Sequence, residues 1–197
     1  MILSAVEVLG SGSLTHINSV IFDEEAAYVN SWSLGQAYKV DLETGDLIWT
    51  LGEGGDFAAD GAADTPWFSH AHSIEMVPEK EGSFLFYDNG PRSRGVSRVV
   101  EYTLDEQTMD AEITWEYPGD IAQDRWFNEA WGDVDPLENS NILVTAGNAT
   151  MGDTQSRLFE VTREGMVVWE VVWGVNDGGD PMGSYAAERI PAVAVEL

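Results

Sequence analysis

Residues 97–103 read SRVVEYT, and residues 156–162 read SRLFEVT. Ser, Arg, Glu and Thr recur in register, and each stretch leads to a strand-like run that ends in Trp-Glu, at Trp115 and at Trp169. A weaker third copy precedes them and ends at Trp49. The tryptophans are 66 (115 − 49) and 54 (169 − 115) residues apart. This spacing is typical of a repeat architecture and is slightly long for one four-stranded propeller blade with its loops.

The apolar pattern predicts strands throughout the chain and little helix. Val, Ile, Tyr, Phe and Trp fill short runs that Gly, Asp, Asn and Pro separate, and no long segment has a 3.6-residue period. We therefore expect an all-β fold, a β-propeller of four-stranded antiparallel blades, with about three blades plus a partial fourth that begins near Tyr185. Residues 1–197 are predicted to form one partial propeller domain. The predicted strands are 16–22, 26–32, 36–42, 46–51, 72–77, 83–88, 97–104, 111–117, 132–137, 141–146, 156–162 and 166–173.

Composition narrows the classes of partner. The chain of 197 residues is 44% hydrophobic, so it can bury a core, and no apolar run approaches 18 residues, so no membrane insertion is expected. A net charge of −26 argues against binding nucleic acid or anionic membrane surfaces, and it indicates an acidic, solvated surface. The absence of cysteine excludes disulfides, thiolate metal sites and cysteine nucleophiles. The first residues, MILSA, lack the basic region of a signal peptide.

Two of the three histidines occupy matched places in successive repeats. His16 and His72 each open an apolar strand-like run. The first strand of each propeller blade lines the central channel, so the two rings are expected to meet at one mouth of that channel. The later units offer Gly132, Tyr185 and Arg189 there. An imidazole can act as nucleophile, base or acid near neutral pH. The alternative is that both histidines only hydrogen-bond the neighbouring blades.

An ordered set of short motifs covers nearly the whole chain, although no single motif is specific. They are residues 16–19 (HINS), 44–52 (TGDLIWTLG), 68–69 (FS) with His72, 86–90 (FYDNG), 97–102 (SRVVEY), 115–117 (WEY), 132–134 (GDV), 141–144 (NILV), 160–161 (EV), 167–170 (VVWE) and 185–189 (YAAER). In this order the chain resembles the bacterial arylsulfate sulfotransferases, the arylsulfotransferase family, which are six-bladed propellers.

The resemblance implies an enzyme that moves a sulfuryl group from an aryl sulfate to a phenol without a nucleotide donor or other cofactor. In that family a histidine attacks sulfur, a phenol leaves, and the sulfohistidine passes the group to a second phenol. The match puts His72 at the nucleophile position, and it puts His16 and Asn18 at the second active-site histidine and its asparagine. An imidazole can protonate the leaving phenolate, and an amide can donate to sulfuryl oxygen. His70 is the alternative nucleophile if the strand starts earlier.

One departure from the resembled family concerns a cation. The family usually places an arginine against the sulfate in the second strand of the first blade, where this chain has Trp32. Loss of a fixed donor at a charged centre costs about 10²–10³-fold in rate. Arg92 and Arg94 lie outside the repeated stretches and are expected to replace that cation at the substrate. The arginines that recur in register are expected to belong to the blade scaffold; they are Arg98 and Arg157.

A second departure concerns length, because three blades and a fragment make about half of a six-bladed ring. An open ring leaves unpaired strand edges and an exposed channel face. The chain is therefore expected to be a fragment, or to close its propeller as a homo-oligomer. The resembled family is exported to the periplasm, whereas this chain shows no signal peptide, so the sequence leaves the compartment open.

Two other functions compete with sulfuryl transfer. A non-catalytic propeller that binds a partner is the stronger alternative, and an inactive piece of the sulfotransferase belongs to the same class. Residues 41–49 (DLETGDLIW) also resemble the tryptophan-docking motif of quinoprotein propellers, although a hairpin turn and a packed tryptophan explain them more simply. Residues 176–180 (NDGGD) lack the ligand spacing of a Ca²⁺ loop, so no metal site is predicted.

Overall fold

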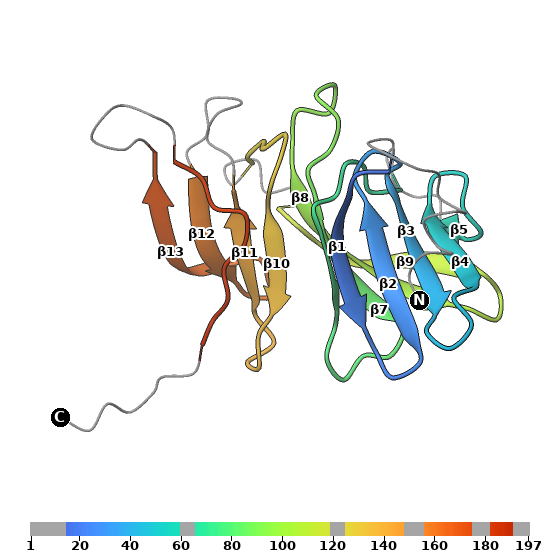
Figure 1. Ribbon diagram of the computed structural model, residues 1–197. Helices are drawn as coiled ribbons and strands as arrows, with labels where there is room; N and C mark the ends of the chain where they lie inside the picture. The colour runs from blue at the N-terminus through green and yellow to red at the C-terminus, as the bar shows by residue number, and fades with distance from the viewer. Residues whose placement is uncertain (1–14, 60–65, 119–124, 148–155, 175–181, 191–197) are drawn as a thin grey trace.

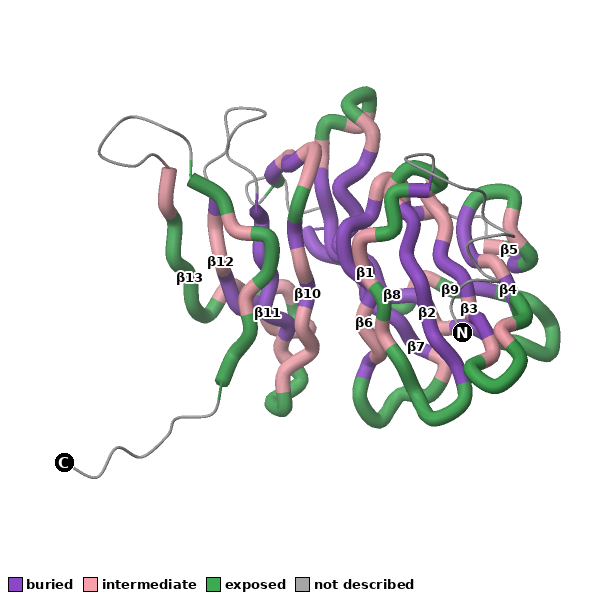
Figure 2. The backbone as a smooth tube through the Cα atoms, viewed as in Figure 1, coloured by how far each residue is buried: buried purple, intermediate pink, exposed green. Residues whose placement is uncertain are grey.

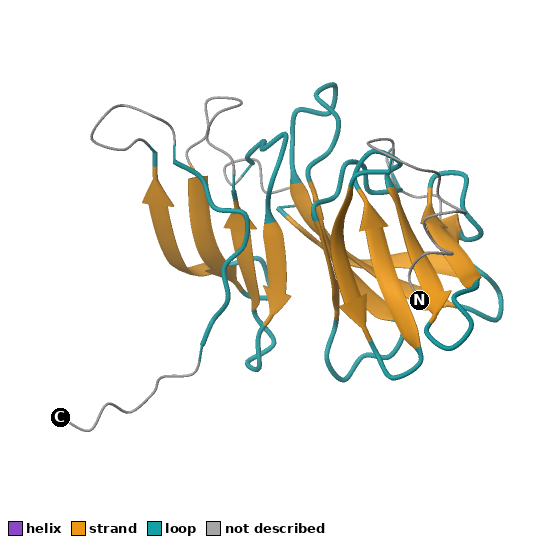
Figure 3. Cartoon of the chain, viewed as in Figure 1, coloured by secondary structure: helices purple, strands orange, loops and turns teal. Residues whose placement is uncertain are grey.

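The computed structural model describes residues 15–59, 66–118, 125–147, 156–174 and 182–190, which contain strands and no helix (Figure 3). The strands form three sheets, each built mainly from consecutive antiparallel strands. This arrangement confirms the prediction of an all-β chain with four-stranded antiparallel units, and no sheet closes on itself. The predicted strand boundaries agree with the observed ones to within about two residues.

The first sheet has the order β1-β2-β3-β4 and the third has the order β10-β11-β12-β13. The second has the order β5-β9-β8-β7-β6, in which the two-residue strand β5 pairs parallel to β9 and was not expected from the sequence. The first sheet contains β1 (Ile17–Phe22), β2 (Ala26–Ser31), β3 (Gln36–Asp41) and β4 (Leu47–Gly52). The second contains β5 (Ala58–Ala59), β6 (Ser73–Met76), β7 (Ser83–Asp88), β8 (Arg98–Asp105) and β9 (Asp110–Tyr117). The third contains β10 (Asp133–Pro136), β11 (Ile142–Ala146), β12 (Ser156–Val161) and β13 (Val167–Trp173).

The sheets stack face to face in series, with the second between the other two (Figure 1). Large aromatic side chains fill both interfaces, because flat rings bury much apolar area between pleated surfaces. Tyr28 of the first sheet lies 4.9 Å from Phe84 of the second, and Tyr117 of the second lies 5.9 Å from Phe159 of the third, measured between ring centroids. The strands β2, β7 and β11 are buried along their whole length (Figure 2).

The first strands of the three sheets, β1, β6 and β10, lie next to one another along one side of the stack. Their N-terminal ends point the same way, so the residues just before each strand meet at one end. These residues are His16, His72 and Gly132. The sheet order therefore brings three positions more than 50 residues apart in sequence to one place.

The recurring Ser-Arg and Trp-Glu motifs make equivalent contacts in the second and third sheets. The glutamate that follows each motif tryptophan pairs with the motif arginine across the strands: Arg98 Nη1 lies 3.0 Å from Glu116 Oε2, and Arg157 Nε lies 2.6 Å from Glu170 Oε1. The arginines thus stabilise the sheets, as expected from their register. Opposite charges on neighbouring strands make such pairs favourable.

The fourth unit predicted from Tyr185 onward was wrong for the described residues 182–190, which contain no strand. This segment crosses in front of the third sheet (Figure 1) and bonds to loops and side chains of other elements. The Ser184 N–H donates to the Gly147 carbonyl at 2.9 Å, and Arg189 pairs with Glu160 at 2.8 Å. Without a neighbouring strand to form a ladder, its apolar pattern does not become a strand.

Candidate active site

His16 and His72 lie together, as their matched positions predicted. Their ring centroids are 6.2 Å apart and the planes are nearly perpendicular, at 81°. His16 has φ +42°, a left-handed conformation that is uncommon outside glycine, and its side chain is exposed. His72 is 3% exposed. One imidazole is therefore open to solvent and its neighbour is enclosed.

The hydrogen bonds around Asn89 define the proton position on His72. The fully buried Asn89 donates both N–H groups of its side chain, to the carbonyls of Asn128 at 2.8 Å and Trp131 at 2.9 Å. Its Oδ1 atom therefore faces His72 Nδ1, at 2.8 Å, and can only accept. This requires the proton to be on Nδ1, and it leaves Nε2 of the neutral ring with its lone pair.

Burial keeps His72 neutral. The pKa of His72 is lowered to about 4, chiefly by desolvation and to a smaller extent by the nearby His16, while hydrogen bonds to Asn89 and to the His70 backbone act in the opposite direction. Near neutral pH the ring is unprotonated at Nε2, which is the form that can attack an electrophile.

Trp32 lies among all three histidines of the chain. Its ring centroid is 4.6 Å from His70, 5.0 Å from His16 and 6.1 Å from His72. The position at which the sequence analysis expected an arginine is therefore occupied by an indole that packs against the imidazoles. An indole contributes apolar surface and one N–H donor and carries no charge.

Asn18 and Tyr185 lie on either side of the His16–His72 pair. Asn18 donates from Nδ2 to the Ala71 carbonyl at 3.0 Å and accepts from Asn30 at 2.7 Å, so it ties β1 to the residue just before His72. Tyr185 has its ring centroid 5.9 Å from His72, and its hydroxyl reaches the Asn18 carbonyl at 3.4 Å. The segment 182–190 therefore covers one side of His72.

The two candidate substrate cations are engaged by carboxylates. Arg92 Nε pairs with Glu129 at 2.5 Å, and its side chain is 69% exposed. Arg94 donates to the buried carboxylate of Asp88 at 2.7 Å. Arg94 also lines a cavity next to His70, whereas Arg92 lies on the outer surface with its partner.

Sequence reasoning missed Asn89 and the residues that hold it. Asn89 follows β7 directly and precedes a glycine, which is a common turn sequence. It lies in the stretch 86–90 that contributes to the family resemblance, but nothing in that stretch marked it as the partner of a histidine. Trp131 and Gly132 have φ +62° and +128°, and this bent backbone directs the Trp131 carbonyl to Asn89. A Cβ atom at Gly132 would lie 2.2 Å from Tyr87 Cε1. Only glycine therefore fits at the position that matches the two histidines.

Three carboxylates lie on the first strands of the second and third sheets: Glu75 on β6, and Asp133 and Asp135 on β10. On β6 and β10 they alternate with the buried Ile74 and Val134, so they share the opposite face. Desolvation and mutual repulsion raise the pKa values of Glu75 and Asp135 to about 7, and desolvation raises that of Asp133. In the described part of the chain no three His, Asp or Glu residues are arranged to hold a metal ion. The loop of residues 176–180 lies outside it.

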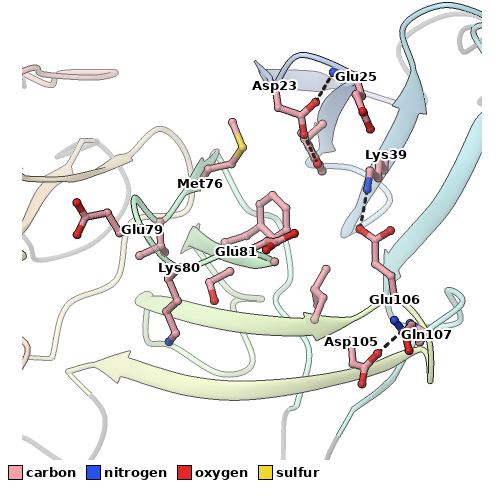
Figure 4. A pocket seen from close by; sticks show the side chains of 16 residues that line it. Asp23, Glu25, Lys39, Met76, Glu79, Lys80, Glu81, Asp105, Glu106 and Gln107 are labelled. Atoms are coloured by element: carbon pink, nitrogen blue, oxygen red, sulfur yellow. Dashed lines mark hydrogen bonds and ion pairs between the residues drawn. The ribbon is translucent and has the colours of Figure 1, made fainter.

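A wider hollow, of about 1010 Å³, lies at the opposite end of the first two sheets. Both lysines of the chain reach it, among several carboxylates (Figure 4). Lys39 pairs with Glu106 at 2.7 Å, and Lys80 pairs with Glu101. Because its cations are paired and it contains no histidine, the candidate chemistry belongs to the histidine end.

No described helix is long and apolar enough to cross a membrane.

One of the comparisons with known proteins, the match to a family model, identifies a family for the chain. No curated protein sequence matches the chain. A solved structure of a protein of unknown function from Bacteroides caccae is 12% identical, with a TM-score of 0.44, over 85% of this chain and 52% of that one. The hydrazine synthase of Kuenenia stuttgartiensis is 9% identical, with a TM-score of 0.40, over 83% of this chain and 51% of that one. The chain thus spans about half the length of these structures. The model of the arylsulfotransferase (ASST) family matches residues 10–177, which is most of the chain, and the protein therefore belongs to the arylsulfotransferase family.

Proposed function

We propose that this chain carries the sulfuryl-transfer site of a nucleotide-independent aryl sulfotransferase, with His72 as the nucleophile. The observation that supports this best is the hydrogen bond from His72 Nδ1–H to Asn89, because it leaves Nε2 unprotonated in a ring whose pKa is about 4. Membership of the family supports aryl sulfates and phenols as the substrate class.

In the first half-reaction, the Nε2 lone pair of His72 attacks sulfur. An N–S bond forms, the bond between sulfur and the aryl oxygen breaks, and the electron pair leaves with the phenolate. The ring becomes positively charged, and Asn89 Oδ1 stabilises that charge through the shared Nδ1–H. His16, exposed and 6.2 Å away, is the acid that protonates the phenolate.

In the second half-reaction, a second phenol gives its proton to His16 and attacks the sulfur. The N–S bond breaks and its electron pair returns to His72 Nε2. Asn18, through its remaining N–H, is proposed to bind the sulfate ester at the transfer site. The rings of Trp32 and Tyr185 supply apolar surface for the aryl group.

We further propose that the three sheets are blades of a propeller whose ring is completed by a second copy. The first strands gather on one side, as they do around a propeller channel, and both ends of the stack carry exposed apolar residues. These include Val20, Phe22 and Ile48 on the first sheet, and Val168, Val171 and Val172 on β13.

Incubation with 4-nitrophenyl sulfate and phenol tests the transfer. We expect release of nitrophenol and a sulfuryl mass increase on the peptide that contains His72. His72→Ala should abolish both, because no covalent intermediate can form. His70→Ala is the matched control and should retain the adduct. His16→Ala should slow turnover by about 10²–10⁴-fold while His72 is still sulfated slowly.

A mass increase on His70 would make that residue the nucleophile instead. If neither histidine is modified and no nitrophenol appears, the chain is a non-catalytic propeller that binds a partner.

A further inference from the structure

A cavity of about 420 Å³ opens beside the histidine cluster, between the first two sheets. Leu34, Trp67 and Pro91 form apolar parts of its wall, and Ser69, His70 and Arg94 form polar parts. Small-molecule sites typically have this volume and this mixture of apolar wall and few convergent polar groups. The transfer reaction proposed above uses His72 and leaves His70 without a role.

The polar wall is held rigidly by one buried carboxylate. Asp88 is fully buried and accepts from the Ser69 N–H at 2.9 Å and from Arg94 Nη1 at 2.7 Å. Ser69 Oγ in turn bonds His70 Nδ1 at 2.7 Å. His70 has φ +57°, so the backbone takes an uncommon conformation there. These bonds fix the imidazole and the guanidinium before any ligand arrives.

A glycine makes room for the guanidinium. Gly90 has φ +75°, and a Cβ at this position would lie 2.1 Å from Arg94 Nη2. The guanidinium therefore rests directly on the backbone, and Arg94 also donates from Nε to the Val96 carbonyl at 2.8 Å. Its side chain remains 16% exposed, toward the cavity that it lines.

The charges of this cavity suit an anion with a single charge. Arg94 shares the buried Asp88 with Arg98, whose Nε lies 2.8 Å from the same carboxylate oxygen. Arg98 also pairs with Glu116, whose side chain is exposed, so among the described residues Asp88 is the one buried carboxylate that pairs with these two guanidinium groups. The exposed carboxylate of Glu53 lines the cavity too and opposes a second negative charge. Planar guanidinium groups bind sulfate-type oxygens well and pack against aromatic rings.

We propose that this cavity is a separate binding site for aromatic monoanions of the sulfate-ester and sulfonate class. The aryl ring lies against Leu34, Trp67 and Pro91, and the anionic group meets Arg94 and His70. The identity of the natural ligand as an aryl sulfate rests on the proposed function. The His70 ring is packed against Trp32, and the same indole contacts both histidines of the transfer site, so it connects the histidines of the two sites.

Calorimetric titration with naphthalene-2-sulfonate tests the site, because a sulfonate has no S–O ester bond to transfer. Leu34→Glu places a negative charge in the cavity and should weaken binding at least tenfold. Leu42→Glu is the matched control, since Leu34 and Leu42 lie in turns of the same sheet and are 45% and 44% exposed. The Leu42→Glu substitution should leave the Kd for naphthalene-2-sulfonate unchanged. His70→Gln should weaken binding several-fold, and 1-naphthyl phosphate, a dianion at pH 8, should bind at least fivefold more weakly.

Equal affinity in the Leu34→Glu and Leu42→Glu proteins would overturn the proposal, as would the absence of binding at millimolar sulfonate. The His72→Ala protein separates this proposal from the transfer function. It should bind naphthalene-2-sulfonate as tightly as the parent while forming no sulfohistidine. Binding that needs His72 and ignores Leu34 would place the ligand in the transfer site and overturn the second site alone. Leu34-dependent binding without any sulfuryl adduct in the parent would overturn the transfer function alone.

Discussion

At the scale of single residues, the proposed attack on sulfur depends on which nitrogen of His72 carries the proton. We expect the His72 ring to titrate near pH 4 rather than near 6.5, because burial disfavours its charged form. Imidazole NMR shifts followed from pH 3 to 8 measure this, and the spectrum of His72→Gln identifies the signal. A midpoint at or above 6.5 would show that Asn89 and the surrounding burial do not keep the ring neutral.

Gly132 is a second residue on which the site depends. Gly132→Ala should destabilise the fold by about 3 kcal/mol or more, because a Cβ there meets the Tyr87 ring and because a side chain strains a backbone with φ +128°. Gly54→Ala is the control, since Gly54 also has positive φ, +73°, but has open space around it. Backbone strain alone should cost about 1–2 kcal/mol there. Urea unfolding measures both values, and equal losses would rule out the clash with Tyr87.

At the scale of elements, the paired carboxylates of β6 and β10 make stability depend on pH. The pKa of Glu75 is raised to about 7 in the folded chain, so its contribution is favourable below its ordinary pKa and is lost as pH rises from about 4.5 to 7. Glu75→Gln should therefore gain about 1 kcal/mol or more at pH 8 and nothing at pH 4. Urea unfolding at both pH values measures this, with Glu112→Gln on the exposed face of β9 as control.

His72 acts in the opposite direction. Its folded pKa lies below the ordinary value, so the stability that it contributes is present above about pH 6.5 and is lost as pH falls toward 4.

For the Glu75→Gln experiment, a gain in stability that is the same at pH 4 and pH 8 would mean that the Glu75 carboxylate does not cause the pH dependence.

The strands were predictable from the sequence because each sheet repeats the same local pattern, whereas the contacts that complete the site join distant segments. The alternation of apolar residues and turn residues fixes strands such as β7 and β8 without any tertiary information. Asn89 acquires its role only when the carbonyls of Asn128 and Trp131 arrive from the next sheet. The matched positions of His16 and His72 were visible because the repeat itself predicts their proximity.

The incorrect prediction of a strand unit at residues 182–190 has a related cause. The segment around Tyr185 has strand-like composition, but strand formation requires a neighbour that supplies backbone partners. Here the nearest elements offer the Gly147 carbonyl and the side chain of Glu160 instead. The engagement of Arg94 by Asp88 likewise depended on the fold, because a sequence shows which arginines are present and not which carboxylates they face.

At the scale of the whole molecule, exposed apolar strands and a net charge of −26 oppose each other. β13 is an edge strand with Val168, Trp169 and Val171 exposed, and such edges favour pairing with another chain. Mutual repulsion between copies is screened by salt, since the Debye length falls from about 30 Å at 0.01 M to about 3 Å at 1 M. Self-association should therefore strengthen as salt is added.

Sedimentation velocity across this range of salt measures the association. Val171→Lys should reduce it, because the substitution puts a charge on the exposed edge. Met109→Lys changes the charge equally on a half-exposed turn of the second sheet and should have little effect. A monomer at every salt concentration, or equal behaviour of the two variants, would exclude association through β13.

The contact of Tyr185 with His72 has a consequence for the newly made protein. The two residues are 113 positions apart (185 − 72), yet their rings are 5.9 Å apart. A ribosome adding about 5–20 residues per second needs roughly 6–23 s to make the intervening chain. A nascent polypeptide stalled before Tyr185 would leave this side of the imidazole open to an acylating reagent, whereas a chain that includes residues 182–190 would protect it. The His72 imidazole is thus synthesised well before the segment that completes its enclosure.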